Sequence, residues 1–275
     1  MKNVNLILTL PSGMCVATSL GIEGLARHYS PGSGQVFRGR AIFIDLKIKD
    51  RKPAFAYRDE GGWRDARGDT ETTVLAWSDA GGTSDAGLQG LSGAAERNED
   101  ILYVCHDHEA CMNAGIQRAP ATPRGARTTT APMITPTFHP RKDLIGILAA
   151  HRIPYAATST VAHPVDLIEK VQKARAFRGT KFLHILAPCP PGWQISSEET
   201  IDLARQAVRT RVFPLFEVEN GQRWRFTTDH PGDPVEPYIR RQGRFGNLTP
   251  EQIRRLQAEV DARWEMLKRR VEAGT

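Results

Sequence analysis

The amino-acid sequence predicts an α/β protein with a mainly parallel sheet, helices on both faces and a C-terminal helical tail. Two short apolar runs of strand type, residues 74–77 and 101–105, enclose a glycine-rich turn and a helix-like pattern over residues 86–97. Strand, turn, helix and strand in this order form a right-handed βαβ unit whose two strands are parallel. The apolar run at residues 182–187 predicts a further buried strand.

The elements between these strands follow from apolar periodicity. Residues 141–150 predict a helix and residues 155–158 a short strand. Pro164 then begins another helix, since proline is tolerated in the first turn. Four apolar residues of this helix are expected to point toward the core: Val165, Ile168, Val171 and Ala174.

The C-terminal part predicts a hairpin and a long helix. Ser196 and Glu199 form a capping box for a helix that runs to residue 208. Residues 213–226 alternate in hairpin fashion around Asn220-Gly221, a strong turn signal. Thr249 caps the last helix, whose apolar positions step by three and four residues. These positions are Ile253, Leu256, Val260, Trp264, Leu267 and Val271.

The first 73 residues are the least periodic part of the chain. A helix-like pattern covers residues 12–27, and only residues 41–44 and 54–57 have the composition of short strands. We therefore divide the chain into a divergent N-terminal part of the same domain, a core and a C-terminal hairpin and helix extension. The boundaries are 1–73, 74–212 and 213–275.

Composition excludes several classes of function. The chain has 275 residues, of which 40% are hydrophobic and 25% are charged, as in ordinary globular proteins. Its net charge of +6 is not gathered into a basic stripe with interleaved aromatic residues, which argues against nucleic-acid binding. No apolar run is long enough to cross a membrane. We therefore expect a cytoplasmic protein without a disulfide framework, in which Cys105 is a buried thiol.

Polar side chains follow both strands of the βαβ unit. Gly81 and Gly82 let backbone N–H groups approach an anion, and the following helix start favours negative charge. Because both loops leave the same edge of the sheet, their side chains are expected to face one ligand. A phosphate with Mg²⁺ is the expected guest, and the alternative is a tight turn without a ligand. The side chains concerned are Asp79, Asp85, Asp107, His108 and Asn113.

The wider sequence resembles one enzyme family over roughly residues 74–270. The similar segments include Gly82-Thr83-Ser84-Asp85-Ala86-Gly87-Leu88-Gln89, Asn113-Ala114-Gly115-Ile116-Gln117-Arg118, Leu186-Ala187-Pro188-Cys189-Pro190 and Gln242-Gly243-Arg244-Phe245. They resemble the β subunits of 2-oxoacid:ferredoxin oxidoreductases, above all those of the pyruvate synthase type. The resemblance implies a thiamine diphosphate-binding fold and the oxidative decarboxylation of a 2-oxoacid such as pyruvate to acyl-CoA and CO₂.

The resemblance also implies cofactors and partners. The cofactors are thiamine diphosphate, Mg²⁺ and a [4Fe–4S] cluster, and the partners are an α-type subunit, further γ- or δ-type subunits, ferredoxin and coenzyme A. Asn113 is the expected catalytic residue, and Arg118 is expected to meet the substrate. The expected cofactor-binding residues are Asp79, Gly81, Gly82, Thr83, Asp85, Asp107, His108, Ala110, Asn113 and Gly115. Asp79, His108 and the carbonyl of Ala110 are the expected metal ligands.

The sequence departs from the family pattern at the metal and at the cluster. The metal-binding Asp of the family falls on Ala80, and the second ligand is His108, although imidazole is a poor ligand for Mg²⁺. Either the turn shifts so that Asp79 reaches the metal, or cofactor binding is weakened or lost. Only Cys189 matches a family cluster ligand; Cys15, Cys105 and Cys111 do not.

These departures leave alternatives open. The chain is either an active subunit, or a non-catalytic structural subunit or decayed paralogue that lacks the metal and the iron–sulfur cluster. A thiamine-dependent decarboxylase without redox chemistry would also explain a missing cluster.

Overall fold

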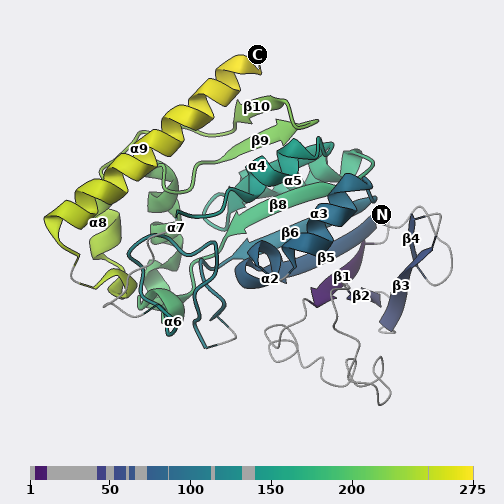
Figure 1. The fold of residues 1–275 in the computed structure, drawn as a ribbon, viewed down its shortest axis with the longest axis horizontal. Coiled ribbons are helices and arrows are strands. Elements are labelled where there is room, and N and C mark those ends of the chain that lie inside the picture. The colour runs from purple at the N-terminus through teal and green to yellow at the C-terminus, as the bar shows by residue number, and fades with distance from the viewer. Residues whose placement is uncertain are drawn as a thin grey trace.

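The computed structural model describes residues 4–10, 42–47, 53–59, 62–65, 73–85, 87–112, 115–131, 140–246 and 248–274. The described strands form one ten-stranded sheet in the order β10-β9-β7-β8-β6-β5-β1-β2-β3-β4 (Figure 1). Neighbouring strands are parallel from β7 through β8, β6 and β5 to β1, and antiparallel toward both ends of the sheet. The mainly parallel α/β fold predicted from the sequence is therefore observed.

The strands have the following bounds. They are β1 (Val4–Leu10), β2 (Ile42–Lys47), β3 (Pro53–Asp59), β4 (Gly62–Asp65), β5 (Thr73–Asp79), β6 (Ile101–Asp107), β7 (Tyr155–Thr160), β8 (Lys181–Leu186), β9 (Phe216–Glu219) and β10 (Arg223–Phe226). The short strands expected at 41–44 and 54–57 correspond to β2 and β3. The helix-like pattern over 12–27 lies outside the described residues.

The helices follow in chain order. They are α2 (Ala80–Ser84), α3 (Leu88–Glu96), α4 (Leu144–Ala150), α5 (Pro164–Ala176), α6 (Pro190–Trp193), α7 (Thr200–Arg209), α8 (Val235–Arg240) and α9 (Pro250–Ala273), with the 3₁₀ turns η2 (Ser197–Glu199) and η3 (Gly243–Phe245). None of the helices in the described ranges is long and apolar enough to cross a membrane.

The two faces of the sheet are covered by different helices, because alternate residues of a strand point to opposite faces. Tyr103 and Cys105 pack with α3, α4 and α9 on one face. Leu102 and Val104 pack with α5 on the other. A third apolar cluster joins α6, α7, α8 and α9 near the carboxyl end of β8. Cys105 is fully buried, as expected, and burial raises the pKa of its thiol.

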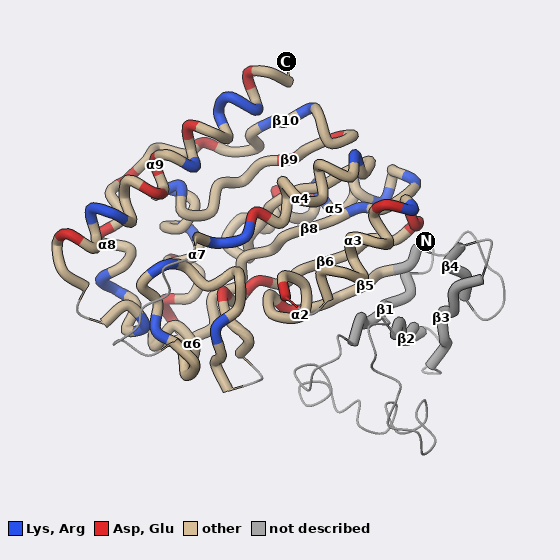
Figure 2. The backbone as a smooth tube through the Cα atoms, viewed as in Figure 1, with Lys and Arg blue, Asp and Glu red and all other residues tan. Residues whose placement is uncertain are grey.

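The C-terminal elements form as predicted. Asn220 and Gly221 both have positive φ, at 53° and 68°, as a two-residue hairpin turn requires. Thr249 and Gln252 form a capping box at the start of α9. Five of the six apolar positions of α9 are buried and Val271 is partly buried. Charged residues of both signs are distributed along the length of this helix (Figure 2).

The orientation predicted for α5 is wrong in its first half. Val165 and Ile168 are 67% and 55% exposed. The buried face instead carries Lys170 and Ala174. Lys170 is satisfied there because its Nζ donates to the Thr158 carbonyl and to Asp166, at 2.7 and 2.8 Å. A paired lysine replaces the expected apolar side chains, and apolar periodicity cannot reveal such a pair.

Candidate active site

The turn after β5 is a short helix capped by Asp79. The Gly82 N–H donates to Asp79 Oδ1 at 2.6 Å, so this carboxylate satisfies the first turn of α2. Asp79 is 4% exposed, and burial raises the pKa of its carboxyl against the lowering effect of this hydrogen bond. Asp85, the C-cap residue of the same helix, is exposed.

Helix α2 packs directly against the loop that follows β6. A Cβ on Gly81 would lie 1.8 Å from Cys111 Sγ, so only glycine permits this approach. Cys111 is held by backbone hydrogen bonds in both directions with Gln117. Thr83 is turned toward the sheet, and its hydroxyl lies 3.2 Å from the hydroxyl of Tyr103. The two loops expected to share a ligand therefore meet in the folded chain.

Asp107, at the end of β6, is fully buried and surrounded by donors. Its Oδ2 lies 2.8 Å from Arg141 Nη2 and 2.7 Å from His184 Nε2, and its Oδ1 accepts the Glu109 N–H at 2.6 Å. Burial alone would raise the pKa of Asp107. The hydrogen bond from His184 and the charge of Arg141 outweigh burial and lower this pKa to about 2. His184 is thus a buried histidine whose Nε2 is satisfied by the Asp107 carboxylate.

Glu109 extends this network toward the C-terminal part of the chain. Its carboxylate is buried and ion-paired with both Arg141 and Arg244. The backbone of Glu109 has φ of 62°, a left-handed conformation that is unusual for a non-glycine residue. Arg244 also stacks on Trp193, with its guanidinium carbon 3.8 Å from the ring centroid. Two buried carboxylates and two buried guanidiniums therefore hold the loop after β6 in an otherwise disfavoured shape.

Sequence reasoning missed Glu109, Arg141 and the structural role of Arg244. Arg244 stands in a segment that resembles the family, but its partner Glu109 is 135 residues earlier in the chain. No local pattern connects two such positions.

His108 is half-buried beside the same loop. Its Nδ1 lies 2.5 Å from the Ala187 carbonyl, which can only accept, so Nδ1 carries the proton. The carbonyl of His108 accepts a hydrogen bond from Trp193 Nε1 at 2.9 Å. The ring of His106 lies 4.8 Å from that of His108, and burial, together with the charge of His108, lowers the pKa of His106 to about 4.

The structure brings together most of the residues predicted for the site. Across the two loops, the charge of His108 lowers the pKa of Asp79 and the charge of Asp107 raises it, although burial has the larger effect. Ala110 is buried in the second loop, and Gly115 has φ of 84°. The Arg118 backbone N–H donates to Thr130 Oγ1 at 2.9 Å. Asn113, the expected catalytic residue, lies outside the described residues.

Comparison with known proteins decides the family. Residues 64–185 match the family model described as the C-terminal TPP binding domain of thiamine pyrophosphate enzymes. The chain is 45% identical over 212 residues to the ketoisovalerate oxidoreductase subunit VorB of Pyrococcus abyssi. The aligned region covers 75% of this chain and 68% of that protein. It is also 45% identical over 203 residues to the pyruvate synthase subunit PorB of Methanocaldococcus jannaschii, covering 72% and 68%.

This chain belongs to the family of 2-oxoacid:ferredoxin oxidoreductase β subunits. The family, the thiamine diphosphate-binding fold and the enzyme class expected from the sequence are thereby confirmed. A solved 2-oxoglutarate:ferredoxin oxidoreductase from Magnetococcus marinus superposes with a TM-score of 0.44 at 16% identity, over 70% of this chain and 62% of that one. A likeness of that degree carries no further conclusion.

The β subunit has unsatisfied polar atoms where a polar ligand is expected. Ser78 Oγ and His106 Nδ1 are buried at the ends of β5 and β6 and have no hydrogen-bond partner in the part of the chain that the structure describes. Buried polar atoms without partners are rare, and a ligand is one common reason for them. This edge of the β subunit is therefore suited to the polar end of thiamine diphosphate.

The side chains of the β subunit do not by themselves fit Mg²⁺. Asp79 uses one oxygen to cap α2, and His108 offers a nitrogen to an ion that prefers oxygen. Asp107 is occupied by Arg141 and His184. The described ranges contain no group of three or more His, Cys, Asp or Glu residues that could hold a metal. The ligand roles expected for Asp79, His108 and Ala110 stay predictions.

The sulfur ligands of the β subunit are dispersed. Cys189 is the N-cap residue of α6 and packs against the third apolar cluster. Cys105 lies within β6 and Cys111 against α2, and the described residues contain no cluster-binding group. A [4Fe–4S] cluster normally needs four thiolates. The described residues of this chain therefore do not fit such a cluster, and Cys189 as a ligand stays a prediction.

Proposed function

We propose that this chain is the thiamine diphosphate-binding β subunit of an enzyme that oxidises a 2-oxoacid to acyl-CoA and CO₂ and passes the electrons to ferredoxin. An α-type subunit, with further γ- or δ-type subunits, would complete the enzyme. The observation that carries this proposal is 45% identity over 75% of the chain, together with a TPP-domain match that spans β5 to β8. The proposed substrates are pyruvate and the branched-chain acid ketoisovalerate, after the two relatives.

The chain's own residues would hold the cofactor at two loops. Gly81, Gly82, Thr83 and Asp85 are the proposed cofactor-binding residues of the first loop, with the Thr83 hydroxyl turned toward Tyr103. The second loop would contribute the proposed cofactor-binding residues Asp107, His108, Ala110, Asn113 and Gly115. We assign the amide of Asn113 to the diphosphate or the substrate carboxylate, and Arg118 to the substrate. Thiamine diphosphate supplies the electron sink for decarboxylation, while the protein orients it and excludes water.

A second candidate function is that of a non-catalytic structural subunit. It is supported by the residues expected to bind the metal, which either lack a ligand atom or already make other contacts. Ala80 offers a methyl group where the family has a carboxylate, and Asp79 already caps α2. A subunit of this kind would keep the fold and α9 for assembly and would not bind the metal.

Titration of thiamine diphosphate into the chain, purified with any partner subunits, distinguishes the two candidates. We expect micromolar binding in the presence of Mg²⁺ by the natural chain. The matched variants are Ala80→Asp, which adds the family's carboxylate, and Ala80→Asn, which adds the same shape without the charge. Binding by Ala80→Asp alone would refute an active natural chain and support the structural subunit. Equal absence of binding in all three proteins would refute the placement of the cofactor at α2.

Two finer proposals accompany the main one. We propose a cytoplasmic location, on the grounds of the sequence alone. We also keep Cys189 as a cluster ligand, with its other thiolates supplied from outside the described residues. Measurement of iron and acid-labile sulfide in the purified complex, with and without Cys189→Ala, tests that assignment, which fails if the variant retains the full iron content.

A further inference from the structure

A cavity of about 270 Å³ lies between the sheet, the start of α4 and the side of α9, apart from the residues assigned to the cofactor. Its wall carries five cationic side chains, namely Arg141, Lys142, Arg211, Arg263 and Arg270. Asp143 is the one carboxylate among its lining residues in the described part of the chain. The wall is therefore strongly positive, and an anion is the complementary guest.

Most of these cationic side chains donate either to backbone carbonyls or to carboxylates that also accept other hydrogen bonds. Arg270 pairs with Asp143 at 3.1 Å, and the other oxygen of Asp143 caps α4. Arg211 donates to the carbonyls of residues 230 and 231, and Lys142 donates to that of residue 84. Arg141 is committed to the buried network of Asp107 and Glu109. The carboxylates that contact these cations therefore already make other hydrogen bonds or ion pairs.

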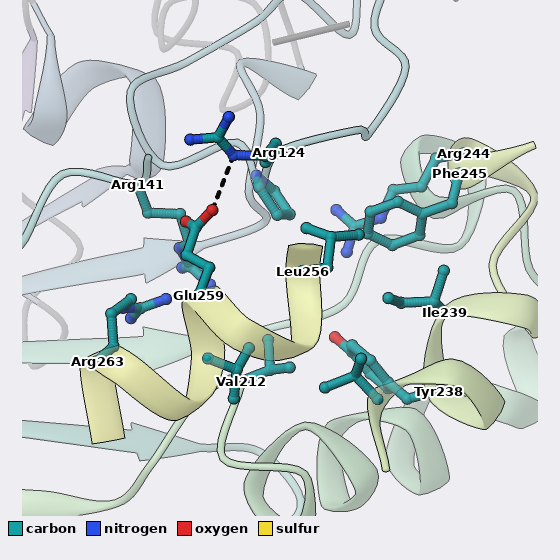
Figure 3. Close-up of a pocket in the computed structure, with 13 residues that line it drawn as sticks. Arg124, Arg141, Val212, Tyr238, Ile239, Arg244, Phe245, Leu256, Glu259 and Arg263 are labelled. Atoms are coloured by element: carbon teal, nitrogen blue, oxygen red, sulfur yellow. Dashed lines mark hydrogen bonds and ion pairs between the residues drawn. The ribbon is translucent and has the colours of Figure 1, made fainter. Parts of the chain in front are cut away.

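Arg263 is the exception in this set. It is half-buried, and it makes no hydrogen bond or ion pair with any of the residues that the structure describes. Arg263 also lines a second pocket, drawn in Figure 3, where its side chain extends from α9 toward Arg141 and Glu259. Glu259 is already paired with Arg124 at 2.8 Å. Burial, and then the like charge of Arg141, lower the pKa of Arg263 and outweigh the opposite effect of Asp143, Glu259 and Glu109, none of which makes an ion pair with it.

Apart from Thr158 and His184, the rest of the wall is apolar. It includes Leu144, Ile145, Phe213, Phe216, Trp264 and Leu267. A guest that carried only charge would leave this surface in contact with water. A carboxylate on a small apolar body satisfies both parts, because guanidinium binds carboxylate in a planar fork and the body covers the apolar wall.

We propose that this cavity binds a small organic carboxylate, with Arg263 as the residue that holds the carboxylate group. The site goes beyond the proposed function and does not rest on it. The guest would lie one side chain away from the loop after β6, since Arg141 lines the cavity and also bonds Asp107 and Glu109.

The test uses 3-methylbutanoate, which has an apolar body but no 2-oxo group for thiamine chemistry. We expect saturable stabilisation of the full chain against heat by this carboxylate, and none by 3-methylbutanamide. Arg263→Met should weaken binding at least about tenfold, as expected for the loss of a charge-assisted hydrogen bond. Arg269→Met, which removes an exposed arginine of the same helix that does not line the cavity, should bind as the natural chain does.

The proposal is overturned by absence of saturable stabilisation, by equal binding of the amide or by unchanged affinity in Arg263→Met. Inorganic phosphate at the same ionic strength provides a further arm, and binding as tight as that of the carboxylate would refute an organic guest. We expect Arg263→Met to fold, since it removes a half-buried charge that lacks a partner. Arg263→Gln keeps a polar side chain and gives the same test if the Met variant does not fold.

Discussion

The buried pairing of Glu109 with Arg141 and Arg244 provides the sharpest test of the structure. Glu109→Gln removes the carboxylate charge but keeps nearly the same shape. Both guanidinium groups are almost completely buried, and Arg244 has no other carboxylate among its described partners. Removal of one member of a buried ion pair typically costs about 3–5 kcal/mol of unfolding free energy, because the remaining charge is left uncompensated.

Urea denaturation and thermal unfolding of the full chain measure this cost. For a domain of this size, about 2–4 °C of melting temperature is lost per kcal/mol, so Glu109→Gln should lower it by about 6 °C or more. The matched control is Glu251→Gln, which breaks the exposed pairs of Glu251 with Arg254 and Arg255 on α9. Exposed pairs contribute about 0–1 kcal/mol, so this control should change little. Equal losses in the two variants would refute the assignment of a stabilising buried network.

Two other predictions concern packing and pH. Gly81→Ala places a Cβ 1.8 Å from Cys111 Sγ and should cost about 1–3 kcal/mol by overpacking. The double variant Gly81→Ala/Cys111→Gly should recover stability in the same melting assay, and an undisturbed single variant would contradict the close contact. Nε2 of His230 accepts the Leu215 N–H at 2.7 Å, and burial lowers the pKa of His230 to about 4 from 6.5. Because the folded pKa is the lower one, the unfolded chain binds the proton first, and stability is lost as pH falls from about 6.5 to 4. The loss at pH 5 is about 2 kcal/mol, which His230→Gln should remove from the pH profile of urea unfolding.

The sequence by itself determined the family, the mainly parallel α/β fold and most of the elements. Short sequence patterns were sufficient to predict elements that are determined by interactions between residues close together in the chain. Asn220 and Gly221 specify a hairpin because few residues accept positive φ, and Thr249 specifies the start of α9 because its side chain satisfies a free N–H group. Apolar residues spaced by three and four specify the buried face of α9, because residues at this spacing lie on the same side of a helix.

Only the tertiary structure decided which polar groups are paired. The fold brings together the partners on which several polar groups depend. Examples are the cap that Asp79 provides to α2, the ion pairs of Glu109 with its two arginines and the hydrogen bonds of the buried Lys170. The cost of burying a charge depends on its partner, and partners that are far apart in sequence leave no local pattern. For this reason, the two loops proposed to hold the cofactor could be predicted from the sequence, but the ion-pair network that shapes the second loop and the unpaired Arg263 became visible only in the fold.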